Sequence, residues 1–197
     1  MSRAWRRLLA SAVLVGFAWI AGRQALGGFL ALAPSAYLAD AQLPTARPRR
    51  ADLEQAIAEL RLAGAVDPRN PQVQAGLGQA TLLLARQAAG ARRLRLVDAA
   101  LAHYRSALAL RPDSPYLWAA LMTALDLRGA LQPLAAAQRA ELSQAMSRAV
   151  RLGPWEPDVL QQVVDVGPRR FAALTPAARH ALEQAAQHTV ALQLRGD

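Results

Sequence analysis

The sequence predicts an all-α chain, in which an N-terminal transmembrane helix precedes an irregular α-α superhelix of about seven helices. Hydrophobic residues make up 53% of the 197 residues, and aromatic residues only 5%. Most of the apolar residues are Ala and Leu, which favour helices over strands. An apolar run follows a group of arginines near the N-terminus, and a pattern of small and bulky residues ending at a proline recurs further on. The first feature predicts the membrane helix, and the second predicts the stacked helices.

The N-terminal segment has the composition of a membrane anchor. Arg3, Arg6 and Arg7 precede an apolar run at 8–21, and a second apolar stretch covers 25–33. A hydrocarbon core of ~30 Å needs about 20 helical residues, so the first run spans it only with its flanking residues. We therefore predict a tail at 1–7 and an anchor at 8–33, with a span of about residues 5–23. Arg23 is expected to extend its guanidinium to the headgroups, and the second stretch either extends a tilted helix or lies in the interface.

The charges around this anchor predict its orientation. Arginines before the span favour a cytoplasmic N-terminus, so the rest of the chain is expected in the periplasm, held by a single pass through a bacterial inner membrane. All 23 basic residues are Arg, which together with the excess of Ala is typical of a GC-rich bacterial genome. Two alternatives stay open: a buried helix of a soluble protein, and a cleaved secretory signal, for which Ala33 followed by Pro34 is a poor cleavage site.

Residues 34–50 are predicted to form a Pro/Arg-rich linker. Pro34, Pro44 and Pro48 remove backbone donors and break helices. The linker is expected to begin with no more than one helical turn, through Tyr37 and Leu38. Its arginines at positions 47, 49 and 50 are candidates for contact with lipid headgroups.

Residues 51–197 are predicted to form one helical repeat domain. In its clearest unit, small residues let two helices approach closely, a bulky aromatic fills the gap between them, and a proline ends the second helix. The residues that define this unit are Ala100, Tyr104, Ala107 and Pro112, with Trp118 and Leu121 in the helix that follows. Two further copies of the pattern are Ala56, Leu60, Ala63, Pro68 and Leu142, Met146, Ala149, Pro154.

The units are irregular. Pro68, Pro112 and Pro154 lie 44 and 42 residues apart, which is longer than a helix–turn–helix repeat of about 34 residues. The extra residues fall at 87–96 and 128–137, where either a helix is longer or an ordered loop protrudes. A last helix is expected to start at Thr175 as N-cap, with Pro176 at its first position, and to run to about residue 193. Such a helix caps the open end of a stack.

The unit around Pro112 resembles a tetratricopeptide repeat, and Leu77-Gly78 matches the Leu-Gly pair of that family's first helix. The resemblance implies a scaffold that binds other proteins. In this family the first helix of each repeat lines a concave face. Mapped through the prolines, the implied partner-binding groove consists of Gln72, Ala75, Gln79, Tyr116, Ala119, Thr123, Asp126, Asp158, Gln161 and Asp165.

This strip is polar and mildly acidic. It lacks the clamp of Lys, Arg and Asn by which some members of the family hold a C-terminal carboxylate. We therefore expect a basic or neutral segment of another membrane-associated protein as its partner.

No pattern in the sequence points to catalysis, to a metal site or to a cofactor. The chain has no Cys, and His103, His180 and His188 are expected to be solvated on helix surfaces. The net charge of +9 comes from dispersed arginines without interleaved aromatic residues, which disfavours nucleic acid as a partner. We therefore predict a protein that is not an enzyme and has no small-molecule substrate.

The layout of an anchor followed by such helices is similar to small accessory proteins of bacterial exopolysaccharide biosynthesis clusters, with most of the likeness in residues 155–175. The resemblance implies a scaffold in exopolysaccharide biosynthesis or export. The main alternative is a periplasmic assembly factor for secretion, cytochrome maturation or lipoprotein handling. A third is an enzyme of glycan metabolism that uses Asp158, Asp165, His180 and His188.

Overall fold

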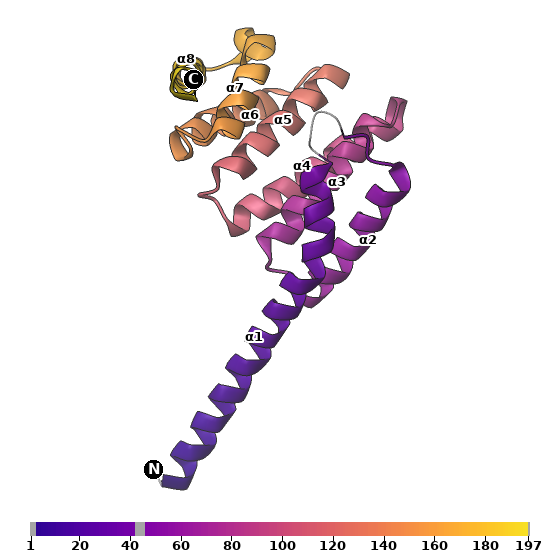
Figure 1. Ribbon diagram of the computed structural model, residues 1–197, viewed down its shortest axis with the longest axis vertical. Helices are drawn as coiled ribbons and strands as arrows, with labels where there is room; N and C mark the ends of the chain where they lie inside the picture. The colour runs from indigo at the N-terminus through magenta and orange to yellow at the C-terminus, as the bar shows by residue number, and fades with distance from the viewer. Residues whose placement is uncertain (1–2, 42–45, 197) are drawn as a thin grey trace.

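The computed structural model of the chain describes residues 3–41 and 46–196, which form eight α-helices and one 3-10 helix, with no strand among them (Figure 1). The prediction of an all-α chain is confirmed for these residues, and seven helices follow the N-terminal one as expected. The helices are α1 (Arg3–Asp40), α2 (Arg50–Val66), α3 (Pro71–Arg86), α4 (Gly90–Leu110), α5 (Pro115–Leu131), α6 (Ala136–Leu152), α7 (Pro157–Arg170), η1 (Phe171–Ala173) and α8 (Pro176–Gly196).

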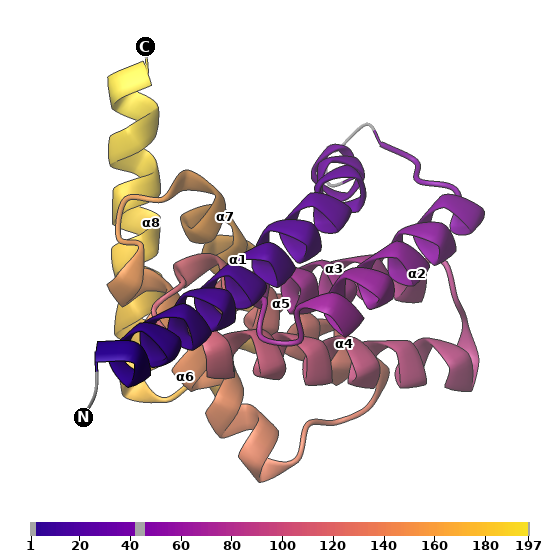
Figure 2. The same cartoon turned by 90° about the horizontal axis from the view of Figure 1, so that it is seen from below.

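Consecutive helices form four pairs that stack side by side. The C-terminal half of α1 packs with α2, α3 with α4, α5 with α6, and α7 with α8. The first helices of the pairs, α1, α3, α5 and α7, contact one another in succession. Figures 1 and 2 both show α2 beside the end of α1, and Figure 1 shows the start of α1 projecting from the domain.

Similar turns join successive pairs. Pro68, Pro112 and Pro154 each lie two residues after the end of a helix, and a second proline three residues later begins α3, α5 or α7. A proline at the first helical position costs no hydrogen bond, because that backbone N–H has no partner within the helix. The Asn70 side chain caps α3 by accepting from the backbone of Gln72 at 3.0 Å.

The core follows the predicted register in its central unit. Ala100, Tyr104 and Ala107 of α4 are buried, and so is Leu121 of α5. The Tyr104 ring lies directly against Gly78 of α3, where a Cβ atom would stand 2.8 Å from the ring. A residue with no side chain is therefore required for this close approach of α3 and α4.

The extra residues of the long repeats lengthen the helices. Residues 90–96 belong to α4, which has 21 residues, and only residues 87–89 connect it to α3. Between α5 and α6 the connection is limited to residues 132–135. The last helix begins at Pro176 with Thr175 as its cap, as predicted, and it extends to Gly196.

The segment from Pro34 to Asp40 is helical and does not begin a linker. The α1 helix continues through Pro34 to Asp40, so Tyr37 and Leu38 belong to its last turns. Leu38 is 1% exposed, and its carbonyl accepts a hydrogen bond of 2.7 Å from the side chain of Gln79. This packing offsets the backbone hydrogen bond that a proline removes, which explains why the helix does not end at residue 34.

The N-terminal helix includes one candidate membrane span. The stretch Leu14–Asp40 is long and apolar enough to cross a bilayer, with a mean hydropathy of 1.2 over its best window. Only 12% of that window is buried within the protein. Arg23, which was expected to reach for headgroups, donates instead to the carbonyl oxygen of Val66 at 3.0 and 2.7 Å. It thereby caps the end of α2, where the helix dipole favours a cation.

Candidate functional site: a groove along α3, α5 and α7

A groove of about 1200 Å³ opens along the first helices of the pairs. Side chains from α3, α5 and α7 line it, and Ala39 near the end of α1 lies at its edge. A smaller cavity of about 390 Å³ adjoins it and shares residues with it. We call the larger cavity the wide groove, or the wide end, and the smaller one the narrow cavity, or the narrow end. The shared residues are Gln79, Tyr104, Ala120, Gln162 and Asp165.

Most of the groove residues expected from the sequence line these two cavities. The wide groove is lined by Gln72, Ala75, Gln79, Tyr116, Asp158, Gln161 and Asp165, and the narrow cavity by Thr123. Ala119 is fully buried and its neighbour Ala120 faces the cavities instead, so the predicted position is one residue off.

Asp126 lines neither cavity. It accepts hydrogen bonds from Arg169 at 2.8 Å and from Arg170 at 2.6 Å. Because Asp126 lies on α5 and both arginines lie at the end of α7, this carboxylate ties the two helices together. Its role in the structure is to hold the groove's wall, and it presents no free charge to a ligand.

The wide end of the groove is acidic. Glu156 and Asp158 line it at the start of α7, opposite Tyr116. The Tyr116 hydroxyl donates a hydrogen bond to Glu156, and this bond raises the pKa of Tyr116. Arg111 and Asp113, also at this end, form a loose and exposed ion pair of 4.0 Å. Among the residues that the structure describes, no cationic side chain is bound to Glu156 or Asp158, so both charges face this end of the groove.

The middle of the groove carries amides and one buried phenol. Gln79 is held by Leu38, while Thr123 donates to Gln162 at 3.1 Å and Gln161 donates to Asp165 at 2.8 Å. Tyr104 lines both cavities and forms no hydrogen bond with any residue that the structure describes. Its burial raises the pKa of the phenol, so the hydroxyl stays neutral and can donate to a group that enters the groove.

Two arginines line the narrow end, which the sequence mapping missed. Arg86 comes from the last turn of α3 and Arg169 from the last turn of α7. The strip expected from the sequence contained no arginine. The mapping through the prolines stopped at Gln79 on α3 and at Asp165 on α7, and did not reach the last turns of these helices. Arg86 forms no ion pair within the described residues, whereas Arg169 is bound by Asp126.

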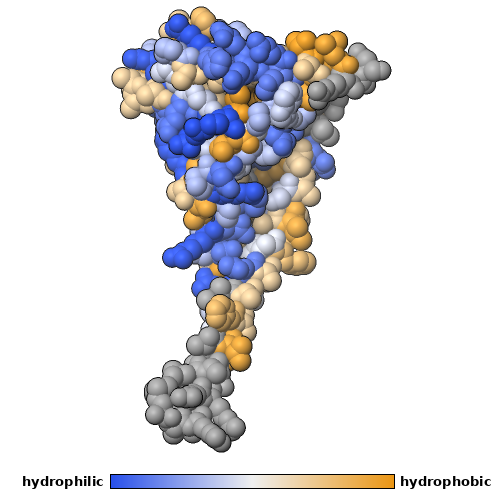
Figure 3. Space-filling model, turned by 90° about the vertical axis from the view of Figure 1, so that its left-hand side faces the viewer, coloured by the Kyte–Doolittle hydropathy of each residue, from blue (hydrophilic) through white to orange (hydrophobic). Residues whose placement is uncertain are grey.

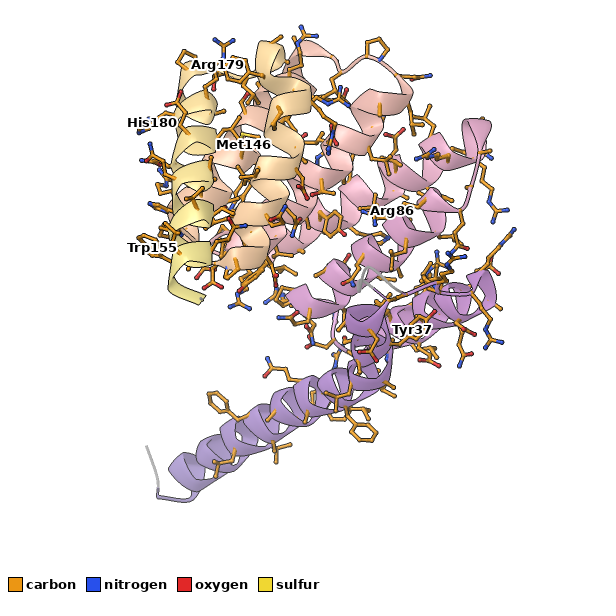
Figure 4. All side chains as sticks on the ribbon, turned by 45° about the horizontal axis from the view of Figure 1, so that its top comes forward. Tyr37, Arg86, Met146, Trp155, Arg179 and His180 are labelled. Atoms are coloured by element: carbon orange, nitrogen blue, oxygen red, sulfur yellow. The ribbon has the colours of Figure 1, made fainter. Side chains whose placement is uncertain are left out.

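The three histidines have different surroundings. His180 is exposed, as expected, but His103 and His188 are half-buried. His103 contacts Gln74 at 3.0 Å, and burial together with the charge of Arg61 lowers its pKa. His188 stacks on Trp155 with ring centroids 4.0 Å apart. Trp155 lies beside α8, the helix that carries His180, and both are at a distance from Arg86 in the middle of the domain (Figure 4).

The structure brings no metal-binding cluster together in the residues that it describes, because no three His, Cys, Asp or Glu side chains gather at one place. Comparison of the chain with protein-family models and with curated proteins finds no match. The groove is therefore the feature from which a function is inferred.

Proposed function

We propose that the protein is a membrane-anchored scaffold that holds a segment of another protein in the groove along α3, α5 and α7. The observation that carries this proposal is the groove itself, which has a volume of about 1200 Å³ and is lined by polar and apolar side chains from α3, α5 and α7, the first helices of three neighbouring pairs. Long concave surfaces built from stacked helix pairs are the usual binding surfaces of helical-repeat proteins. In this proposal the four pairs make up an irregular tetratricopeptide-like superhelix, and α1 supplies the first helix of the first pair.

The anchor places this scaffold in the bacterial envelope. In the proposed arrangement, α1 crosses the inner membrane once, its N-terminus is cytoplasmic and the repeat domain is periplasmic. The support for this orientation is the excess of arginines before the apolar run, since Arg3, Arg6 and Arg7 favour the cytoplasmic side.

The charges of the groove define the partner segment. Glu156 and Asp158 at the wide end favour a basic side chain or an N-terminal amine, and the amides and the Tyr104 hydroxyl in the middle suit a peptide backbone. Arg86 at the narrow end suits a carboxylate or a backbone carbonyl. The partner segment is therefore basic at one end and otherwise neutral. On the resemblance of its layout, we assign the scaffold to exopolysaccharide biosynthesis or export.

Photo-crosslinking in cells tests this proposal. A photoreactive residue at Gln72 or Gln161, both exposed at the groove, should capture the same envelope protein. The matched control is Gln144, which is exposed on α6 outside the groove. Equal capture at Gln144 would contradict the groove as the binding surface. If the captured protein belongs to secretion, cytochrome maturation or lipoprotein handling, the assignment to exopolysaccharide machinery is wrong and the scaffold remains.

A second measurement tests the chemistry of the partner. Synthetic basic peptides should bind the purified protein, and the Asp158→Asn variant should weaken this binding by about 1.4- to five-fold at low salt, since an exposed charge pair contributes ~0.2–1 kcal/mol. The Gln144→Ala variant is the control and should bind as the unaltered protein does. Binding of acidic peptides alone would rule out the proposed charge assignment.

A further inference from the structure

Beyond Arg23, the α1 helix has one face against the protein and one face uncovered. Gly27, Ala31, Pro34 and Leu38 are buried against the repeat domain. On the opposite side, Leu26, Phe29, Leu32 and Ala33 are exposed, and we refer to these four residues as the outer stripe. We call residues 14–26 the bare part of the helix, because every described side chain there is exposed. Phe29 is 70% exposed, as much as Phe17 in the bare part, which is 68% exposed. The repeat domain therefore leaves bulky apolar side chains uncovered directly beside its own surface.

The outer stripe continues the candidate span without a polar interruption. The only polar residues between Leu14 and Ala33 are Arg23 and Gln24. They lie four and three residues before Gly27, so helical periodicity places both on the side that faces the domain. Figure 3 shows a band of hydrophobic surface that rises from the grey tip along one edge of the molecule, while the other edge of the body above the tip is hydrophilic.

The length of the apolar run favours this continuation. From Leu8 to Arg23 the helix rises about 22 Å, which is short of a hydrocarbon core of ~30 Å. From Leu8 to Ala33 it rises about 38 Å. If the bilayer extends past Arg23 on one side of α1, along the outer stripe, the apolar face of the helix is long enough to cross the hydrocarbon core. On the other side, the turn from Asp67 to Asn70 lies beside Gly27, and its polar groups belong outside the hydrocarbon.

We propose that the outer stripe is covered by lipid, so that the bilayer rises along one face of α1 and the repeat domain rests on the membrane surface. This inference depends on the proposed anchor. Arg23 and Arg69 then lie at the level of the headgroups, where Arg69, which forms no ion pair within the described residues, meets lipid phosphate.

One earlier expectation changes under this arrangement. Arg49 and Arg50 lie at the far end of α2, about 24 Å along that helix from Val66 and the membrane level. They are bound to Asp52 at 2.9 Å and Glu54 at 2.8 Å. They therefore do not contact headgroups, and the wide groove, whose edge includes Ala39, stands at a fixed height above the bilayer.

Single-cysteine spin labelling tests the inference, because the chain has no cysteine of its own. The variants are Phe29→Cys in the outer stripe, Val15→Cys in the candidate span and Val190→Cys on α8, an exposed apolar position at the opposite end of the domain (Figure 1). Each labelled full-length protein is placed in vesicles of phosphatidylethanolamine and phosphatidylglycerol. The accessibility of the label to oxygen and to a water-soluble nickel chelate is then measured.

The labels at positions 29 and 15 should show an oxygen-to-nickel accessibility ratio several-fold above that of the label at position 190. A label at position 29 that resembles the one at position 190, with position 15 in lipid, overturns the inference and leaves the anchor intact. Low accessibility of the label at position 29 to both reagents overturns the inference, because it means that protein and not lipid covers the outer stripe. Spin–spin broadening would then identify the covering protein as a second copy of the chain. A water-exposed label at position 15 means that the proposed anchor itself is wrong.

Discussion

The two parts of α1 have similar composition and opposite surroundings. Between Leu14 and Leu26, every side chain that the structure describes is exposed. Between Gly27 and Ala41, a residue in every third or fourth position is buried against α2 or α3. Both parts are rich in Ala, Gly and Leu, and each contains one Phe. Apolar content therefore does not decide which part of a helix joins a protein core; the presence of neighbouring helices decides it.

This difference has a consequence for the way in which the domain is attached. Because α1 has no break between Arg3 and Asp40, the candidate span and the first helix of the first pair are one rigid element. The groove, which borders Ala39, is fixed relative to the span by helical geometry. An anchor with a flexible linker would leave its direction free.

The largest expected effect comes from removing a buried side chain in the packed part of α1. Leu38→Ala should lower the free energy of unfolding by about 2–5 kcal/mol, because it leaves a cavity between α1 and the repeat domain. Val15→Ala, in the bare part, should change it by less than about 0.5 kcal/mol. Urea unfolding of the full chain in detergent micelles, followed by circular dichroism, measures both. Equal losses in the two variants would show that the two parts of the helix are not different in the way described.

The sequence predicts the second helix of each pair well and the first pair poorly. The register of Ala100, Tyr104 and Ala107 follows from periodicity alone, and the ends of α2, α4 and α6 follow from the proline that lies two residues after each of them. The helix that the sequence does not predict is the C-terminal half of α1, which is the first helix of the first pair. A proline at position 34 argues locally for a helix end, and only the tertiary contacts of Leu38 and Gln79 override it.

The residues of the candidate site also fall into two groups, those that the sequence predicts and those that it does not. Positions on the early turns of α3, α5 and α7 follow from the spacing of the prolines, which is why Gln72, Tyr116 and Asp158 all line the groove. Arg86 and Arg169 come together at the narrow end from two different helices. Asp126 and Arg170, which form a hydrogen bond, lie more than 40 positions apart in the sequence. No local pattern signals such pairs, because they depend on how α5 and α7 stack.

A smaller effect is expected where α1 first meets the domain. At Gly27, a Cβ atom would stand 2.7 Å from the Cβ of Asp67, so Gly27→Ala should push α1 and α2 apart and cost about 1–3 kcal/mol. The adjacent Gly28 has no atom within 4 Å of that position. Gly28→Ala should therefore be neutral or gain up to about 1 kcal/mol from helix propensity. The same urea unfolding measures both, and a loss at Gly28 as large as that at Gly27 would place the boundary between the two parts elsewhere.

The smallest expected effect is on the pH dependence of the unfolding free energy, which should arise in the packed domain and not in the bare part of α1. Burial, with a contribution from Arg61, lowers the pKa of His103 in the folded state, while the unfolded chain titrates near ~6.5. The folded state then binds fewer protons, so the stability that depends on neutral His103 is complete above about pH 6.5 and declines as the pH falls below it. The bare part, residues 14–26, contains no His, Asp or Glu.

His103→Gln should keep a polar group opposite Gln74 and remove this part of the pH dependence. The difference in unfolding free energy between pH 7.5 and pH 5.5 should therefore be smaller in this variant than in the unaltered chain. The control is His180→Gln, since His180 is exposed at the surface of α8. If His103→Gln and His180→Gln reduce the pH dependence equally, the half-buried position of His103 is not its source, and the acid sensitivity of the domain does not arise where α3 packs on α4.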